Sequence, residues 1–174
     1  MTSTRLGWSF YLVLIVACPL TFLLHESAHW LTGEWLGYAM TMSLNAATPS
    51  GGVFTSDTHT MLVSAAGPLI TLLQAVIAFL LIQRRQIQLA YPVLFVAWMM
   101  RFAAMVVSIK HPNDEARISA MLGLGTWTLP ALMVSLLFGL LYLGSRTLKL
   151  NWRQNLACYL IASAMIAAIV VLDA

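Results

Sequence analysis

Five long apolar stretches of this 174-residue chain limit what it can fold into. They cover approximately residues 7–31, 60–82, 87–109, 118–144 and 154–172. Each is long enough to cross a hydrocarbon core of about 30 Å, which takes roughly 20 residues of α-helix. None has the regular alternation of a membrane β-barrel, and a backbone in lipid must otherwise be helical. The sequence therefore predicts an all-α, polytopic membrane protein with about five transmembrane helices.

The composition agrees with this class of protein. Hydrophobic residues make up 60% of the chain and charged residues only 9%, whereas a soluble domain has about a quarter charged residues. We expect one membrane-embedded domain over residues 1–174, in a multi-pass protein of a bacterial inner or plasma membrane. Since no basic run is interleaved with aromatic residues, the lipid bilayer is an expected partner and nucleic acid is not.

The connection between the first two stretches, residues 37–57, has a different pattern. Larger apolar residues alternate with smaller or polar ones from position 38 to 44, as in a strand. Gly51 and Gly52 follow in a turn-type sequence, and Val53 begins a second short run. We predict a short β-hairpin between the first and second helices, with its turn at these glycines. Because open strand edges cannot face lipid, the hairpin is either a plain surface feature or the wall of a wet cavity that could hold an extended peptide.

The first apolar stretch leads directly into the sequence H-E-S-A-H at positions 25–29. On a helix, His25 and His29 lie one turn apart on the same face, so both imidazoles can bind one ion. Neutral imidazole suits Zn²⁺, and Glu26 is placed to take a proton from water at such an ion. The alternative is a pair of interior histidines bonded to backbone or to each other. Ionisable groups at membrane depth are costly and usually functional, which favours the metal site.

Two histidines leave a catalytic zinc without a third protein ligand. The other dense cluster of ligand-type side chains lies at positions 110–118, after the third stretch. On chemistry alone Asp114, Glu115 and His111 compete for the third position, and a solvated charged loop is the alternative. Arg101 lies inside the third stretch, where it either snorkels to one face or needs a partner such as Asp114 or Glu34.

Taken in order, these features resemble the site-2 protease family of intramembrane zinc metalloproteases. That family has H-E-x-x-H in a membrane helix, short strands with a Gly-Gly turn, an A-G-P helix and a later D-G-G-R or similar sequence. The corresponding segments here are positions 25–29, Gly51-Gly52-Val53, Ala66-Gly67-Pro68-Leu69 and Asp114-Glu115-Ala116-Arg117-Ile118. The resemblance covers roughly residues 21–118. It departs from the family because both glycines after the aspartate are replaced, and it suggests a minimal member without a PDZ domain.

The resemblance implies one Zn²⁺ per chain, bound by His25, His29 and Asp114, with Glu26 as the catalytic base. It places the catalytic core at about residues 7–118, with additional helices over residues 118–174. The implied reaction is hydrolysis of a peptide bond in a membrane-spanning or membrane-associated substrate. The residues that we expect to contact this substrate are Met42, Gly51, Gly52, Val53, Asn113 and Arg101.

Two other functions are consistent with the same residues. A membrane zinc hydrolase acting on a lipid amide or ester would use the same ligands and the same base. A non-enzymatic metal-binding membrane protein would use the ligands alone. Glu26 argues against the second alternative, because a transport or structural site needs no base beside its ligands.

The distribution of basic residues predicts the orientation. With five spans, two basic residues outside the spans, Lys110 and Arg117, fall on the side of the zinc motif. Cytoplasmic loops carry the excess of Lys and Arg, so the N-terminus is predicted to be cytoplasmic and the zinc end to face outward. The basic residues on the N-terminal side are Arg5, Arg84, Arg85, Arg146, Lys149 and Arg153.

Overall fold

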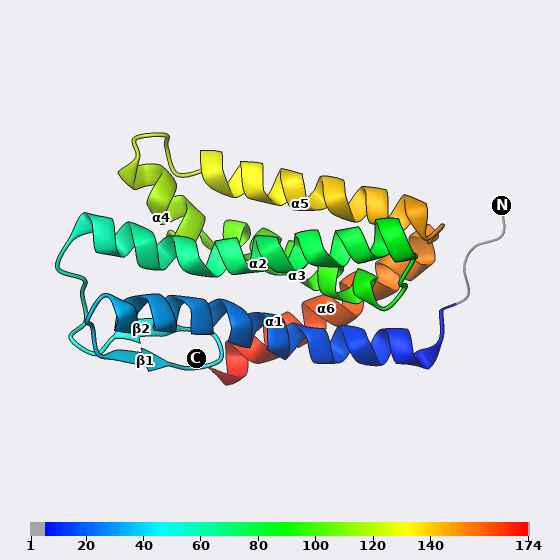
Figure 1. Cartoon of the computed structure of the whole chain (residues 1–174), viewed down its shortest axis with the longest axis horizontal. Coiled ribbons are helices and arrows are strands. Elements are labelled where there is room, and N and C mark those ends of the chain that lie inside the picture. Colours follow the sequence, from blue (N-terminus) through cyan, green and yellow to red (C-terminus); the bar gives the residue numbers. More distant parts are fainter. Residues whose placement is uncertain (1–5, 174) are drawn as a thin grey trace.

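The computed structural model describes residues 6–173. Within this range the chain forms six helices and one pair of short strands (Figure 1). All the helices except α4 are long and apolar enough to cross a membrane, which confirms the predicted fold class. The helices are α1 (Trp8–Trp35), α2 (Asp57–Arg85), α3 (Ala90–Val107), α4 (Asp114–Met121), α5 (Thr128–Thr147) and α6 (Trp152–Leu172).

Helix α3 is the centre of the bundle. It packs against α1, α2, α5 and α6, and its Tyr91, Leu94 and Val96 are fully buried. Phe10 and Leu14 of α1 belong to the same apolar core. The outward faces of the other long helices carry many exposed leucine, isoleucine and valine side chains. Such an apolar outer surface is unusual for a soluble monomer and suits contact with lipid.

The prediction of one continuous fourth span over residues 118–144 is wrong. The structure divides this region into α4 and α5. Gly123 and Gly125 lie between them with φ angles of +70° and +78°. This left-handed conformation ends a helix and is available to glycine at little cost. Helix α4 therefore stops at Met121, and it is a short helix that packs against α2 and α5.

The predicted hairpin between α1 and α2 is confirmed, but its turn is elsewhere. Strand β1 (Met40–Met42) pairs antiparallel with β2 (Ala47–Pro49). The turn between them is closed by Ser43, whose N–H donates to the carbonyl of Ala46 at 2.8 Å. Gly52, with φ +84°, instead donates its N–H to the carbonyl of Pro49 and ends β2. The predicted second strand from position 53 to 55 is absent, since the glycines follow both strands rather than connect them.

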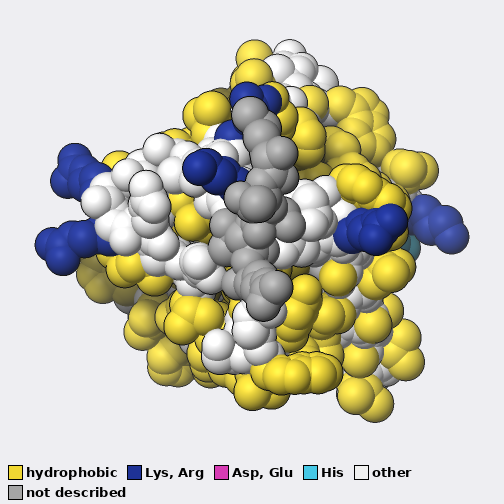
Figure 2. Space-filling view, turned by 90° about the vertical axis from the view of Figure 1, so that its right-hand side faces the viewer, with side chains coloured by type: hydrophobic (Ala, Val, Ile, Leu, Met, Phe, Trp, Pro, Cys, Tyr) yellow, Lys and Arg dark blue, Asp and Glu magenta, His cyan; other side chains and the backbone are white. Residues whose placement is uncertain are grey.

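Basic side chains gather at one end of the bundle. The end of α2, the end of α5 and the start of α6 meet at this end, and the hairpin and α4 lie at the other (Figure 1). Figure 2 views the first of these ends and shows Lys and Arg side chains around it. Arg5, which also contributed to the predicted charge bias, lies outside the described residues. The basic residues in these described segments are Arg84, Arg85, Arg146, Lys149 and Arg153.

We predict that this basic end faces the cytoplasm. Single cysteines at Ser50 and Gln88, which are both exposed, would report the two ends of the bundle. The native Cys18 and Cys158 are buried and would be replaced by alanine. An impermeant thiol reagent applied to intact cells should label position 50, and position 88 only after lysis. The reverse pattern would show that the charge bias is overridden and that the hairpin faces the cytoplasm.

Candidate metal centre

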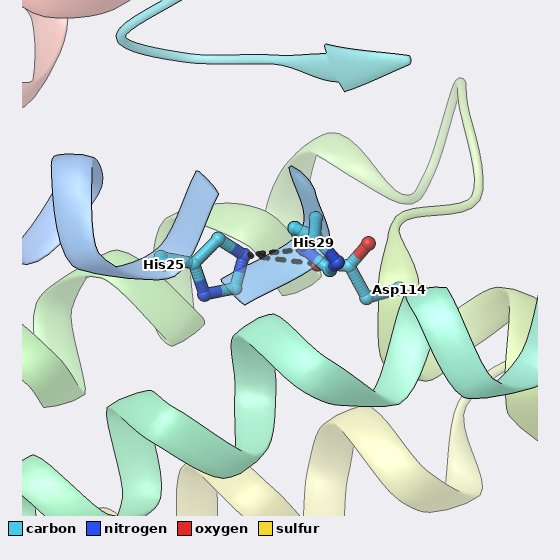
Figure 3. Close-up of side chains that lie close together, drawn as sticks. All are labelled: His25, His29 and Asp114. Carbon is cyan, nitrogen blue, oxygen red and sulfur yellow. Dashed lines mark hydrogen bonds and ion pairs between the residues drawn. The ribbon is translucent and has the colours of Figure 1, made fainter. Parts of the chain in front are cut away.

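The two histidines of α1 and the first residue of α4 point toward one another (Figure 3). One ligand atom from each of His25, His29 and Asp114 lies within 4.8 Å of the others. Asp114 Oδ2 is 3.1 Å from His25 Nε2 and 3.3 Å from His29 Nε2. The two Nε2 atoms are 3.1 Å apart. Both histidines are buried, with 2% and 5% of their surface exposed.

The outer nitrogen of each imidazole has a partner on α2 that fixes the tautomer. His29 Nδ1 lies 2.6 Å from the carbonyl of Val63, which can only accept a hydrogen bond. His25 Nδ1 lies 3.0 Å from the hydroxyl of Thr71, whose own proton is donated to the carbonyl of Gly67. Both Nδ1 atoms must therefore be the donors in these bonds. In the neutral imidazoles, both Nε2 lone pairs then face Asp114 Oδ2 and each other.

Three acceptor atoms that converge in this way can bind one cation together. Two imidazole nitrogens and one carboxylate oxygen are the ligand set of a catalytic zinc, whose fourth position is left for water. The Nδ1 bonds to α2 supply the outer partners that commonly orient metal-binding histidines. The residues present therefore fit a zinc ion, which His25, His29 and Asp114 would hold.

The two histidines favour the ionised form of Asp114. Burial by itself would raise the pKa of this carboxyl group, but its hydrogen bonds with His25 and His29 hold that pKa well below the usual range. Because these side chains must be deprotonated to bind a metal, zinc affinity is expected to rise with pH.

Gly67 of α2 allows the two imidazoles to reach this position. A Cβ atom at residue 67 would overlap the rings of both His25 and His29. In the sequence, Ala66-Gly67-Pro68 served only as part of the family resemblance, and the glycine was assigned no role. The structure shows that this glycine adjoins the rings of His25 and His29, and the A-G-P pattern was the sequence signal that could have indicated this contact.

Of the three candidates for the third ligand, only Asp114 joins the histidines. Glu115 turns away and contacts Arg101, and His111 is exposed. Arg101 also lies 3.4 Å from Asp114 Oδ2, so its partners are the two carboxylates of α4. Glu34, considered as a partner for Arg101, instead accepts a hydrogen bond from the N–H of Met40.

A cavity of about 610 Å³ opens beside the ligands. Glu26, with 7% of its surface exposed, lines it together with all three ligands. Strand β2 forms part of the wall, and so do Ile166 and Val170 of α6. The sequence placed the last helix outside the expected catalytic core, among the additional helices over residues 118–174. The structure shows that it borders the site.

The residues predicted to contact a substrate separate into two groups. Gly52, Val53, Asn113 and Arg101 line the cavity, and Met42 and Gly51 are not among its lining residues. The sulfur of Met42 instead accepts a hydrogen bond from the hydroxyl of Ser27 at 3.7 Å. The side-chain amide of Asn113 is engaged as a donor to the carbonyl of Ala104 at 3.3 Å.

A long-range contact fixes the hairpin over the cavity. Asp173, at the end of α6, accepts hydrogen bonds from the hydroxyl of Ser43 at 2.6 Å and from the N–H of Asn45 at 2.7 Å. The hydrogen bond from Ser43 is the main reason that the pKa of Asp173 is lowered. Residues 43 and 173 are 130 positions apart, so no local sequence pattern indicated this contact.

Comparisons of the chain with protein-family models, curated proteins and solved structures found no match.

We predict that His25→Ala, His29→Ala and Asp114→Asn each lower zinc affinity by more than about 100-fold, because each removes a direct ligand. Loss of an outer partner typically costs roughly 10- to 100-fold. The control His111→Ala should bind zinc as the wild type does. Metal analysis of the purified protein and competition with a chelator would measure zinc binding in the variants and in the control. Undiminished zinc in a variant lacking both histidines would rule out this centre.

A methyl group at residue 67 should disturb the centre without removing a ligand. Gly67→Ala is expected to lower zinc affinity on the order of 10- to 100-fold, as for a lost outer partner, because the added Cβ displaces both imidazoles. Gly139→Ala is the matched control, since a Cβ there meets nothing within 4 Å. The same chelator competition would compare them. Equal zinc affinity in the two variants would contradict the close approach of α2 to the ligands.

Proposed function

We propose that this protein is an intramembrane zinc metalloprotease of the site-2 protease type. The observation that carries the proposal is the convergence of His25, His29 and Asp114 beside Glu26 in one cavity. The ligands lie on α1 and α4, and α1 is long and apolar enough to cross a membrane. When bound, zinc would lower the pKa of a water ligand and polarise a substrate carbonyl.

Glu26 has the position and the surroundings of a general base. It follows His25 directly and therefore projects from α1 beside the ligands rather than into them. It lines the cavity, where its carboxylate can take a proton from a water molecule and deliver it to the leaving amine. A binding protein that only holds a metal would have no use for a carboxylate at this position.

The wall of the cavity supports a peptide as the substrate. Thr48 faces Thr41 in the ladder, and the flanking pairs are Ala47 with Met42 and Pro49 with Met40. Ser43 and Ala46 form a hydrogen-bonded pair at the turn. Because hydrogen-bonded and non-hydrogen-bonded pairs alternate along an antiparallel ladder, the two flanking pairs are non-hydrogen-bonded. The N–H and carbonyl of Ala47 therefore point away from β1, along the edge of a strand that lines the cavity. An extended peptide can pair with such an edge.

A peptide bond in a helix is shielded by its own hydrogen bonds, so a membrane-spanning substrate has to unwind near the site. Pairing with β2 would hold the unwound segment in an extended form beside Glu26. The cavity also contains polar side chains, including Asn45 and Thr48, which give water a route to the site. The same wall therefore offers a strand edge for an extended substrate and a polar route for water, which supports the proposal.

Glu26→Gln tests this proposal directly. The substitution keeps the ligands, so zinc content should be unchanged, while removal of a general base should slow hydrolysis by about 10²- to 10⁴-fold. Membranes from cells expressing the Glu26→Gln variant or the wild type would be compared by mass spectrometry of their peptides. We expect intact substrates to accumulate in the variant and fragments cut in or near a membrane span in the wild type. A change in lipids with no change in peptides would instead indicate a lipid amide or ester hydrolase.

A further inference from the structure

We propose that Arg101 is a second catalytic residue, whose guanidinium group donates a hydrogen bond to the carbonyl oxygen of the bond being hydrolysed. This inference rests on the proposed function and adds a residue to it. Arg101 lies on α3, has only 4% of its surface exposed and lines the same cavity as Glu26. A buried guanidinium on a helix of membrane-spanning length is costly and calls for a function.

The contacts of Arg101 divide its nitrogens into two sets. Nη1 is held by the carboxylates, 3.3 Å from both oxygens of Glu115 and 3.4 Å from Asp114 Oδ2. Nη2 lies 3.4 Å from His25 Nε2. Nε is buried and has no acceptor among the described residues 6–173. Nη1 is therefore held by the two carboxylates of α4, and Nη2 faces the ring of His25.

The donor that faces the ligands loses its acceptor when a metal is bound. His25 Nδ1 is committed to Thr71, so only Nε2 can bind a metal. An Nε2 atom that binds a metal has no lone pair left for Arg101 Nη2. A buried donor without an acceptor is strongly unfavourable, and the nearest place for a new acceptor is the cavity beside the ligands. A substrate carbonyl oxygen that enters this place would satisfy Nη2, and the bond would strengthen as negative charge develops on that oxygen.

Glu115 offsets the positive charge of Arg101, which would otherwise repel a metal ion at the neighbouring site. Its carboxylate is buried against Arg101, so Asp114 is not the only counter-charge of the guanidinium. Glu115 also fixes the direction of the guanidinium through two contacts to Nη1. It is a positioning residue for Arg101. Asn113, which precedes Asp114, donates one N–H of its side-chain amide to the carbonyl of Ala104.

The test uses the purified full chain loaded with Co²⁺, whose visible absorption reports the ligands around the ion. Acetohydroxamate, a small oxygen donor, is the probe for an anionic oxygen at the site. Arg101→Lys and the double variant Arg101→Gln/Glu115→Gln are compared with the wild type. The double variant leaves no unpaired buried charge, so it preserves the fold where a single neutral substitution could disrupt it. Arg117→Gln is the matched control, because Arg117 lines the same cavity but donates to Ser64.

We expect both Arg101 variants to bind Co²⁺ and to lose roughly 10- to 100-fold in affinity for acetohydroxamate, the range for one lost charged hydrogen bond. The affinity of the Arg117→Gln control for acetohydroxamate should stay within about twofold of the wild type, because the exposed charge of Arg117 is screened. With a substrate identified through Glu26→Gln, kcat of the Arg101 variants should fall by about 10²- to 10³-fold with little change in KM.

Equal acetohydroxamate affinity in wild type and variants would overturn the role of Arg101. A loss confined to Co²⁺ affinity would also overturn it, since Arg101 would then only support Asp114. A wild type that binds neither Co²⁺ nor acetohydroxamate would refute the proposed function instead.

Discussion

The close approach of α1 and α2 at Gly67 is the contact on which the candidate metal centre depends. Val63, Gly67 and Thr71 are spaced four residues apart and so form one stripe along α2. The first and last members of this stripe bind the outer nitrogens of His29 and His25, and the glycine between them leaves room for both rings. One face of α2 thus fixes the tautomer, the orientation and the spacing of both ligands.

A second constraint is that ionisable groups inside a membrane bundle must satisfy one another. Arg101 binds Glu115, and Asp114 is shared by Arg101 and the two histidines. Removing one member of such a network leaves a buried charge without a partner, which is typically more costly than the pair is stabilising. The network is therefore expected to respond to substitution as a unit, and pairs of substitutions that conserve the charge balance are better tolerated than single ones.

The sequence predicted the long helices and the positions of His25, Glu26 and His29, because both signals are local. Asp114 could be preferred over Glu115 only through the resemblance to a family. The structure separates them because adjacent residues of a helix point about 100° apart, toward the histidines in one case and toward Arg101 in the other. Local hydropathy did not reveal the left-handed glycines that end α4. It also gave no indication that both imidazole rings lie against Gly67.

The hairpin could not have a fixed place on its own, since a pair of three-residue strands is barely stable in isolation. Two carboxylates from different helices hold it. Glu34 near the end of α1 binds the N–H of Met40 at the start of β1, and Asp173 after α6 binds the turn. A carboxylate at a helix C-terminus is unfavourable because of the helix dipole, and the hydrogen bonds from Ser43 and Asn45 offset that cost. The cavity wall formed by β2 is thus held in place relative to His25, His29 and Asp114 by carboxylates near the ends of α1 and α6.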